Sequence, residues 1–435
     1  MKRMNKLALL TVFLLILTIN LFSNGLSLNS VGPKSFAMGG AFLGQADDAT
    51  ALYWNPAGLA NQESSANISF ADVIPIGSYK TSSEDFGYPA GMFDVDAKTK
   101  TNHFVSPNIF INHRINNLAL GFGVYVPAGL GTEYDGKDLL VLSNGKEQKW
   151  LTKIGVINFS PAAAYNFNSF SIGIAMNIMY GSFEIKRPSN VTLDTDGDGI
   201  PETPTSFQYS ETSTGLGYGI TISGLFHITK SISLGTAFRT KTTVKMKGDA
   251  ENLAMTGAGG PAKSDFTRDV AWPMWLGAGL SAKPTDRLTI NADFQFSQWS
   301  DSEDRFKTDF DNDVWSAVTG ATGDDTFVLE WEDATQIRFG MEYKTTDKLA
   351  LRCGYYYDPA PATDDRISIL FPSSTNNVGT IGFGYKINNK LNIDFGTEYL
   401  FGADRNIKFV LANGNMPGTH HLDVFAFSFG AGYKF

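Results

Sequence analysis

The chain has 435 residues, a formal net charge of −9 at pH 7 and a single cysteine, Cys353. The acidic balance argues against nucleic acid as a partner, and one cysteine excludes an internal disulfide. The 44 glycines and 13% aromatic residues, with apolar residues that alternate rather than run together, favour β-structure over transmembrane helices.

The first residues predict a separate export segment. Three basic residues precede the apolar run 7–19, and small residues follow at Ser23 and Gly25. This layout is typical of a secretory signal peptide, and the run is shorter than the ~20 residues that a membrane-spanning helix needs. We therefore expect residues 1–25 to be a signal peptide.

Residues 26–65 form a second unit, which is small, glycine-rich and apolar but lacks strand alternation. Asp47 or Asp48 is placed to cap a short helix that runs through Trp54, and Asn55-Pro56 is a turn signal that ends it. The apolar content predicts that this segment is packed, and the lumen of a fourteen-stranded barrel has room for such a plug.

From residue 66 the chain predicts an all-β domain, a fourteen-stranded antiparallel transmembrane β-barrel over residues 66–435. Between 288 and 297, for example, Leu, Ile, Ala and Phe alternate with Thr, Asn, Asp, Gln and Ser, as expected for apolar residues outside and polar residues inside a barrel. The expected strands lie near 66–80, 103–113, 118–130, 153–167, 170–187, 210–228, 231–248, 273–284, 287–300, 328–345, 348–358, 376–387, 390–402 and 420–435.

The connections between these strands alternate in length. A tight polar turn follows every even-numbered strand except the last, and a loop of well over ten residues follows every odd-numbered strand. This asymmetry is expected when one rim faces the periplasm and the other faces the exterior. The sequence therefore predicts a multi-pass protein of the bacterial outer membrane, surrounded by outer-membrane lipids.

The last strand carries large apolar residues at every second position and ends with Tyr433 and Phe435. Alternate residues of a strand point to opposite faces, so one face is a row of rings. A terminal strand of this kind resembles the signal by which the barrel-assembly machinery recognises outer-membrane barrels, and we expect that machinery to be a partner.

Several short motifs occur in order along the mature chain, and together the chain resembles the FadL family, outer-membrane transporters of long-chain fatty acids and related hydrocarbons. The matching segments are Gly40-Ala41, Ala46 to Ala49, Asn55-Pro56-Ala57, Val126 to Tyr134, Tyr180 with Ile185 and Arg187, Trp275 with Ser297 to Ser300, and Arg366 to Ile369.

The resemblance implies a monomeric barrel blocked by a plug that carries the motif Asn55-Pro56-Ala57. It also implies that a hydrophobic ligand is caught near the outer loops and leaves sideways through a kink in the third strand, at Pro127-Ala128-Gly129. The residues themselves support a kink: proline has no N–H for a neighbouring strand, and glycine permits unusual backbone angles. The alternative is that the third strand simply ends at Pro127.

The resemblance further implies that Arg187 holds a ligand carboxylate, for which a guanidinium is well suited. Arg187 also stands beside Pro188 at an expected strand end, where an ordinary rim arginine is the alternative. A lysine that the family uses with this arginine has no counterpart near Phe327, which leaves uncharged hydrocarbons open as ligands.

The loop after the fifth strand contains Asp194, Asp196 and Asp198 before a glycine. Alternate carboxylates followed by glycine form the first half of a calcium loop, although Thr205 stands where the distal glutamate is expected. A weak calcium site and a solvated acidic loop are both open, and no other cofactor is expected.

We interpret the chain as a passive transporter of hydrophobic molecules and not as an enzyme. The alternatives are a general porin for polar solutes, an adhesive or structural barrel with a permanently shut plug, and, least favoured, an outer-membrane lipase, for which no nucleophile-elbow serine is found. The charged residues expected to hydrate or brace the lumen are Asp293, Arg338, Arg352, Asp394 and Glu398.

Overall fold

The computed structural model describes residues 31–194, 202–302, 304–408 and 416–435. The predicted signal peptide, residues 1–25, lies outside the described residues. In the described part of the chain, no helix is both long enough and apolar enough to span a membrane.

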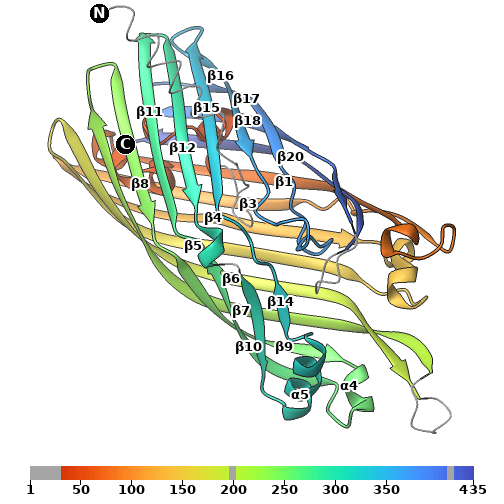
Figure 1. Cartoon of the computed structure of the whole chain (residues 1–435). Coiled ribbons are helices and arrows are strands. Elements are labelled where there is room, and N and C mark those ends of the chain that lie inside the picture. Colours follow the sequence, from red (N-terminus) through yellow and green to blue (C-terminus); the bar gives the residue numbers. More distant parts are fainter. Residues whose placement is uncertain (1–30, 195–201, 303, 409–415) are drawn as a thin grey trace, which may run out of the picture.

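Fourteen antiparallel strands within these ranges form a closed barrel, as predicted (Figure 1). Consecutive barrel strands are paired around the wall, and pairing between the first strand and the last closes it. The strands are β1 (Ser65–Ser82), β3 (Phe104–Ile115), β4 (Leu118–Tyr134), β5 (Trp150–Asn166), β6 (Phe170–Leu193), β7 (Thr203–His227), β8 (Ile232–Arg239), β11 (Trp275–Thr285), β12 (Leu288–Ser297), β15 (Ala334–Lys344), β16 (Leu349–Asp358), β17 (Asn376–Lys386), β18 (Leu391–Gly402) and β20 (Gly418–Lys434).

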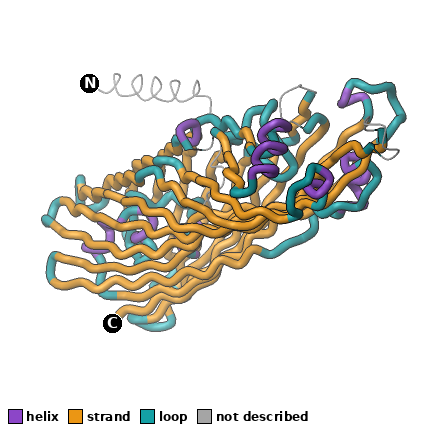
Figure 2. Tube along the Cα trace, turned by 90° about the horizontal axis from the view of Figure 1, so that it is seen from below, coloured by secondary structure: helices purple, strands orange, loops and turns teal. Residues whose placement is uncertain are grey.

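Short strands and helical turns complete the described structure, and Figure 2 shows most of the helical turns at the end of the barrel away from the C-terminus. The additional strands are β2 (Asp94–Lys98), β9 (Thr242–Asn252), β10 (Lys263–Trp272), β13 (Arg305–Phe310), β14 (Thr326–Val328) and β19 (Arg405–Ile407). The helical elements are α2 (Pro33–Ala37), α3 (Ala51–Trp54), α4 (Ala254–Gly257), α5 (Asp313–Thr322), η1 (Pro56–Asn61), η2 (Glu84–Phe86), η3 (Gly136–Ser143) and η4 (Trp299–Asp301).

Two of the expected long loops are wrong, because the strands beside them continue. β6 and β7 stay paired as far as Leu193 and Thr203, and β9 and β10 stay paired as far as Glu251 and Lys263. These extensions have left the apolar belt, so their outward residues are polar and the alternation that marks a membrane strand is lost. The strand ends expected near 187 and 248 are corrected accordingly.

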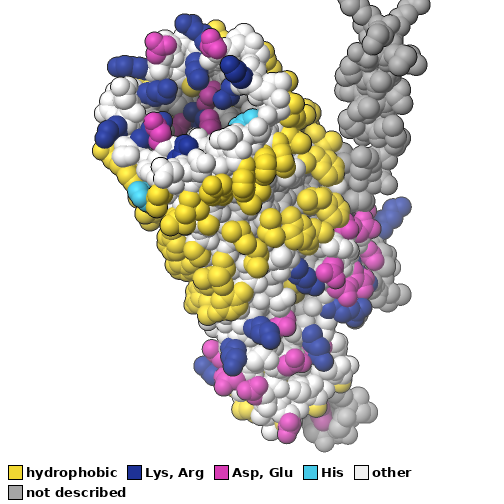
Figure 3. Space-filling model, turned by 90° about the vertical axis from the view of Figure 1, so that its left-hand side faces the viewer, with side chains coloured by type: hydrophobic (Ala, Val, Ile, Leu, Met, Phe, Trp, Pro, Cys, Tyr) yellow, Lys and Arg dark blue, Asp and Glu magenta, His cyan; other side chains and the backbone are white. Residues whose placement is uncertain are grey.

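The outer face of the barrel is an apolar belt, seen as the yellow band in Figure 3. Along β12 the polar residues are buried and the apolar residues are exposed or half-buried, which is the reverse of a soluble protein. Backbone groups in a bilayer must be paired within the protein, and a closed sheet achieves this. Outward apolar side chains include Ile68, Ile109, Phe122, Ile172, Ile222, Leu280, Phe294, Phe339 and Ile381.

Candidate functional site

Residues 31–64 lie against the inward faces of the barrel strands, and Asn55 is a main anchor. Its Nδ2 donates to the carbonyls of Leu43 at 2.9 Å and Gly224, in β7, at 3.1 Å. Its Oδ1 accepts from the N–H of Ala57 at 3.2 Å, which caps η1, and Pro56 occupies the first turn of that helix. The motif thus fixes the turn and ties it to the wall.

Two of the predicted lumen charges, on β12 and β15, also hold this segment. Asp293 Oδ2 accepts from the backbone N–H groups of Phe42 at 2.8 Å and Leu43 at 3.0 Å. Arg338 Nη1 donates to the Gly39 carbonyl at 2.9 Å. At Gly235, on β8, an added Cβ would lie 1.9 Å from the Leu43 carbonyl oxygen. The wall is therefore shaped to the segment as well as bonded to it.

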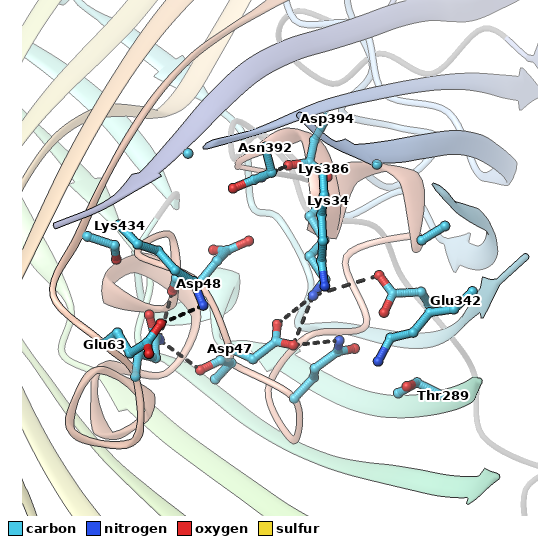
Figure 4. A pocket seen from close by; sticks show the side chains of 18 of the residues that line it. Lys34, Asp47, Asp48, Glu63, Thr289, Glu342, Lys386, Asn392, Asp394 and Lys434 are labelled. Carbon is cyan, nitrogen blue, oxygen red and sulfur yellow. Dashed lines mark hydrogen bonds and ion pairs between the residues drawn. The ribbon is translucent and has the colours of Figure 1, made fainter. Parts of the chain in front are cut away.

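The mouth of the barrel on the short-turn side is a polar cavity of about 860 Å³ (Figure 4). Lys34 pairs with Asp47 at 2.8 Å and with Glu342 at 3.7 Å, and Arg352 joins Glu342 at 2.8 Å to Asp394 at 2.6 Å. These ion pairs connect α2 to β15, β16 and β18. The mouth is lined by charges, so it offers little to an apolar molecule.

Two titrating groups of the segment face this mouth. Burial raises the pKa of Asp48 to about 6, although Lys34 opposes the shift. Burial lowers the pKa of Lys34, but Asp47 and Glu342 outweigh it and hold that pKa above its usual value. Lys34 therefore stays charged and keeps its ion pairs at neutral pH.

The barrel wall is interrupted at the predicted kink. β3 and β4 are paired from their short turn as far as Ile109 and Val124. The β4–β5 ladder then shifts register between Tyr125 and Ala128, which places one extra residue on β4 as a bulge. Pro127 lies within this bulge, and the third barrel strand does not end there. β4 follows β5 and separates from β3.

Beyond this interruption, near the end of β4, residues 99 and 100 pair with β4 again. Thr99 forms a bridge to Tyr134, and the N–H of Lys100 donates to the Glu133 carbonyl at 2.7 Å. Residues 101–108 and 125–133 thus border an opening in the wall, which we call the side window. The Phe104 ring lies across it, because a Cβ added at Gly131 would lie 2.0 Å from that ring.

A cavity of about 660 Å³ lies behind the side window. Its inner wall includes Phe36, Trp331 and Leu400, all of them buried, and it extends to Val105 and Tyr180 on the outside of the barrel. Val105 is 62% exposed and Tyr180 is 41% exposed. The cavity therefore connects the space beside the N-terminal segment with the apolar outer face.

Arg187 lies within β6 and not at its end, because the strand continues to Leu193. Its Nη2 donates to Asp324 Oδ1 at 3.2 Å, and its guanidinium lies over the rings of Tyr209 at 4.7 Å and Phe327 at 5.7 Å. Its Nε is buried without a partner among the described residues. Arg187 does not line the cavity behind the side window.

The remaining predicted residues fall elsewhere. Asp194 follows the end of β6, whereas Asp196 and Asp198 lie outside the described residues, so the calcium prediction stays untested. Tyr433 and Phe435 are exposed at the short-turn end of β20.

Phe104 and Lys34 were not singled out from the sequence. Their positions depend on contacts with residues distant in the chain. Phe104 lies against Gly131, and Lys34 pairs with Glu342.

Comparison with known proteins agrees with this geometry. The family model described as outer membrane protein transport protein (OMPP1/FadL/TodX) matches residues 14–435. Outer membrane protein P1 of Haemophilus influenzae is 23% identical over 337 residues, which cover 71% of this chain and 68% of that protein.

Solved structures share the fold. A FadL homologue of Pseudomonas aeruginosa superposes with a TM-score of 0.78 at 18% identity, covering 94% of this chain and 100% of that one. The toluene transporter TodX of Pseudomonas putida gives a TM-score of 0.69 at 18% identity, covering 94% and 99%. Since the family model covers almost the whole chain, this protein belongs to the FadL/TodX family of outer-membrane proteins, which transport hydrophobic substrates and are not enzymes.

Proposed function

We propose that the protein carries long-chain fatty acids or related hydrocarbons passively across the outer membrane, with capture at the long-loop, extracellular side and lateral release through the side window. The cavity that extends from the lumen through the side window carries this proposal. In the same proposal the barrel is a monomer surrounded by outer-membrane lipids.

The two exit routes differ in how far they expose the ligand to water. Burial of an alkyl chain contributes ~0.8 kcal/mol per methylene, so an apolar cavity binds without an external energy source. A ligand that left through the short-turn mouth would pass Lys34, Glu342 and Arg352 and then enter water. A ligand that leaves between Val105 and Tyr180 passes directly into the apolar layer around the barrel.

The N-terminal segment completes the proposal as a plug. It is anchored to the wall at two places, through Asn55 to β7 and through Phe42 and Leu43 to β12. A lumen closed in this way opposes the flow of ions and polar solutes while the side window stays available to apolar molecules. This distinguishes the proposed transporter from an open general porin.

Closing the side window tests the release route. The variant Pro127→Val with Gly129→Ala restores an N–H and a side chain that let β4 stay in register beside β3. We expect uptake of a radiolabelled alkane and of a fatty acid into cells to fall about ten-fold or more, while equilibrium binding to the purified barrel and its heat stability are unchanged.

A matched control places the same changes away from the side window, as Pro161→Val with Gly379→Ala, and should transport normally. Unchanged uptake by the window variant, with the barrel shown to be folded by its shifted mobility in unheated gel samples, would contradict lateral release.

A further inference from the structure

Seven neighbouring strands of the barrel wall each carry a basic residue at the short-turn end or within two residues of it. The strands are β11, β12, β15, β16, β17, β18 and β20, and each is paired with the next. The basic residues are all exposed, and all except Arg287 line the mouth of the barrel, where Figure 3 shows Lys and Arg side chains around the opening. We call this set the basic crescent: Lys283, Arg287, Lys344, Lys348, Lys386, Lys390 and Lys434.

The basic crescent occupies the lumen-facing register of its strands. Lys344, for example, lies two residues beyond Glu342, which is buried in the lumen, and alternate residues of a strand share a face. The residues that precede three of the lysines are exposed on the outer face instead: Tyr343, Tyr385 and Tyr433. Outward aromatic residues at the end of a barrel are typical of the membrane interface. The cations therefore border the water of the mouth and not the lipid around the barrel.

Pairing between these strands places like charges directly opposite each other three times. In each pair the backbone N–H of the first residue donates to the carbonyl of the second at 2.8 Å: Lys344 to Arg287, Lys386 to Lys348, and Lys434 to Lys390. The Cβ atoms of residues directly opposite on antiparallel strands lie about 4.5–5.5 Å apart, and like charges at such positions destabilise the sheet. A bound anion would remove this repulsion at all three pairs.

Acidic residues of the described chain neutralise only part of this charge. Lys434 pairs with Glu63 at 2.7 Å, and among the described residues the other six members of the basic crescent have no ion-pair partner. Two more acidic residues, Asp286 and Asp347, lie in the turns of the crescent. Among the described residues that line the whole mouth, nine basic ones face six acidic ones, which leaves a net charge of +3. The mouth is therefore cationic in a chain whose formal net charge is −9.

We propose that the basic crescent is a docking surface for an acidic segment of a periplasmic polypeptide. The short turns of an outer-membrane barrel face the periplasm. Neighbouring strands lie about 4.8 Å apart, so the crescent is roughly 30 Å long, and an extended peptide of about nine residues at ~3.3 Å each covers it. A single phosphate reaches one or two of these cations, and lipid head groups lie outside the ring of tyrosines. An acidic segment laid across the mouth brings carboxylates to all three like-charge pairs.

The test measures binding of a defined acidic peptide to the purified, folded barrel in an uncharged detergent. The probe is a fluorescein-labelled peptide of about twelve residues in which glutamate alternates with glycine, long enough to span the crescent. Fluorescence anisotropy gives its dissociation constant, which we expect to rise about ten-fold or more between about 50 and 300 mM NaCl, because salt screens exposed charges. At low salt, the combined variant should raise the dissociation constant about ten-fold or more: Lys344→Gln, Lys348→Gln, Lys386→Gln and Lys390→Gln.

A matched control removes four exposed lysines on the long-loop side and should bind the peptide as the unaltered protein does: Lys98→Gln, Lys137→Gln, Lys146→Gln and Lys247→Gln. If the crescent variant does not fold, the two double variants, at 344 with 348 and at 386 with 390, are measured in its place, and each should weaken binding several-fold.

Three results would overturn the proposal. The first is an unaltered protein that does not bind the peptide, and the second is a crescent variant that binds no more weakly than the control. The third is displacement of the peptide by dioctanoyl phosphatidylglycerol at the same concentration of negative charge, which would assign the crescent to lipid head groups.

Discussion

Single side chains at this site act mainly by fixing backbone that belongs to another part of the chain. Asn55 satisfies carbonyls of the N-terminal segment and of β7 with one amide group. Phe104 lies across an opening whose opposite border is Gly131. Neither residue needs to react with a ligand. We expect Asn55 to affect the local stability of the N-terminal segment and Phe104 to affect the rate of ligand release.

Replacing Asn55 should loosen the N-terminal segment. In Asn55→Ala the carbonyls of Leu43 and Gly224 lose their donor, and each unsatisfied buried group destabilises by about 1–3 kcal/mol. We expect faster hydrogen–deuterium exchange in residues 31–60, with exchange in the barrel strands unchanged. Asn406→Ala, at an exposed position in β19, is the control; equal protection in the two variants would show that Asn55 is not an anchor.

Removing the Phe104 ring should widen the side window. Phe104→Ala deletes the group that lies against Gly131, so we expect alkane release from preloaded barrels into lipid vesicles to accelerate several-fold. Removing an outward ring of similar size, as in Phe339→Ala, should leave the rate as it was. A release rate that is the same in both variants would mean that Phe104 does not obstruct the route.

At the scale of elements, the described structure is a wall of paired strands with two irregular features, the bulge in β4 and the N-terminal segment. The bulge in β4 separates β3 from β4, and the bridge at Thr99 and Tyr134 limits how far they part. The N-terminal segment has little regular structure of its own, and its stability comes from contacts with several barrel strands, among them β7 and β12.

The N-terminal segment should resist proteolysis in the folded barrel. Lys34 pairs with Asp47 within the segment and with Glu342 on β15, so cleavage after Lys34 by trypsin is expected only once these pairs are broken. Glu342→Gln should hasten cleavage by about ten-fold or more, measured by mass spectrometry of intact protein. Rapid clipping of unaltered, folded barrels near Asp47 would show that the segment is a loose tail.

Across the whole molecule, three regions differ in polarity. The outer belt is apolar, the lumen is polar, and the short-turn mouth contains ion pairs that join the N-terminal segment to the wall (Figure 3). A hydrophobic solute can therefore leave with little exposure to water only through the wall. The proposed lateral release would transfer the solute from the cavity behind the side window directly to the apolar outer belt.

Deleting residues 26–60 should turn the barrel into an open pore. The deletion removes the chain that is bonded to the inward faces of β7 and β12, so we expect stepwise ion conductance in planar bilayers where the intact protein shows little. Large conductance from the intact protein would favour a general porin, whereas no conductance after deletion, with the barrel folded, would show that other parts close the lumen.

The sequence by itself determined the properties that depend on local pattern. Alternation of polar and apolar residues predicted all fourteen strands, the short turns and the orientation of the lumen charges. It could do so because consecutive residues of a strand point to opposite faces of the sheet. The same logic failed for the extensions of β6, β7, β9 and β10, where no membrane imposes the alternation.

The tertiary structure decided everything that depends on distant partners. Pro127 signals an irregular strand, but the side window exists because β3 stays with β1 while β4 follows β5. Likewise, the turn at Asn55 could be predicted, whereas its bond to Gly224 joins residues 169 positions apart.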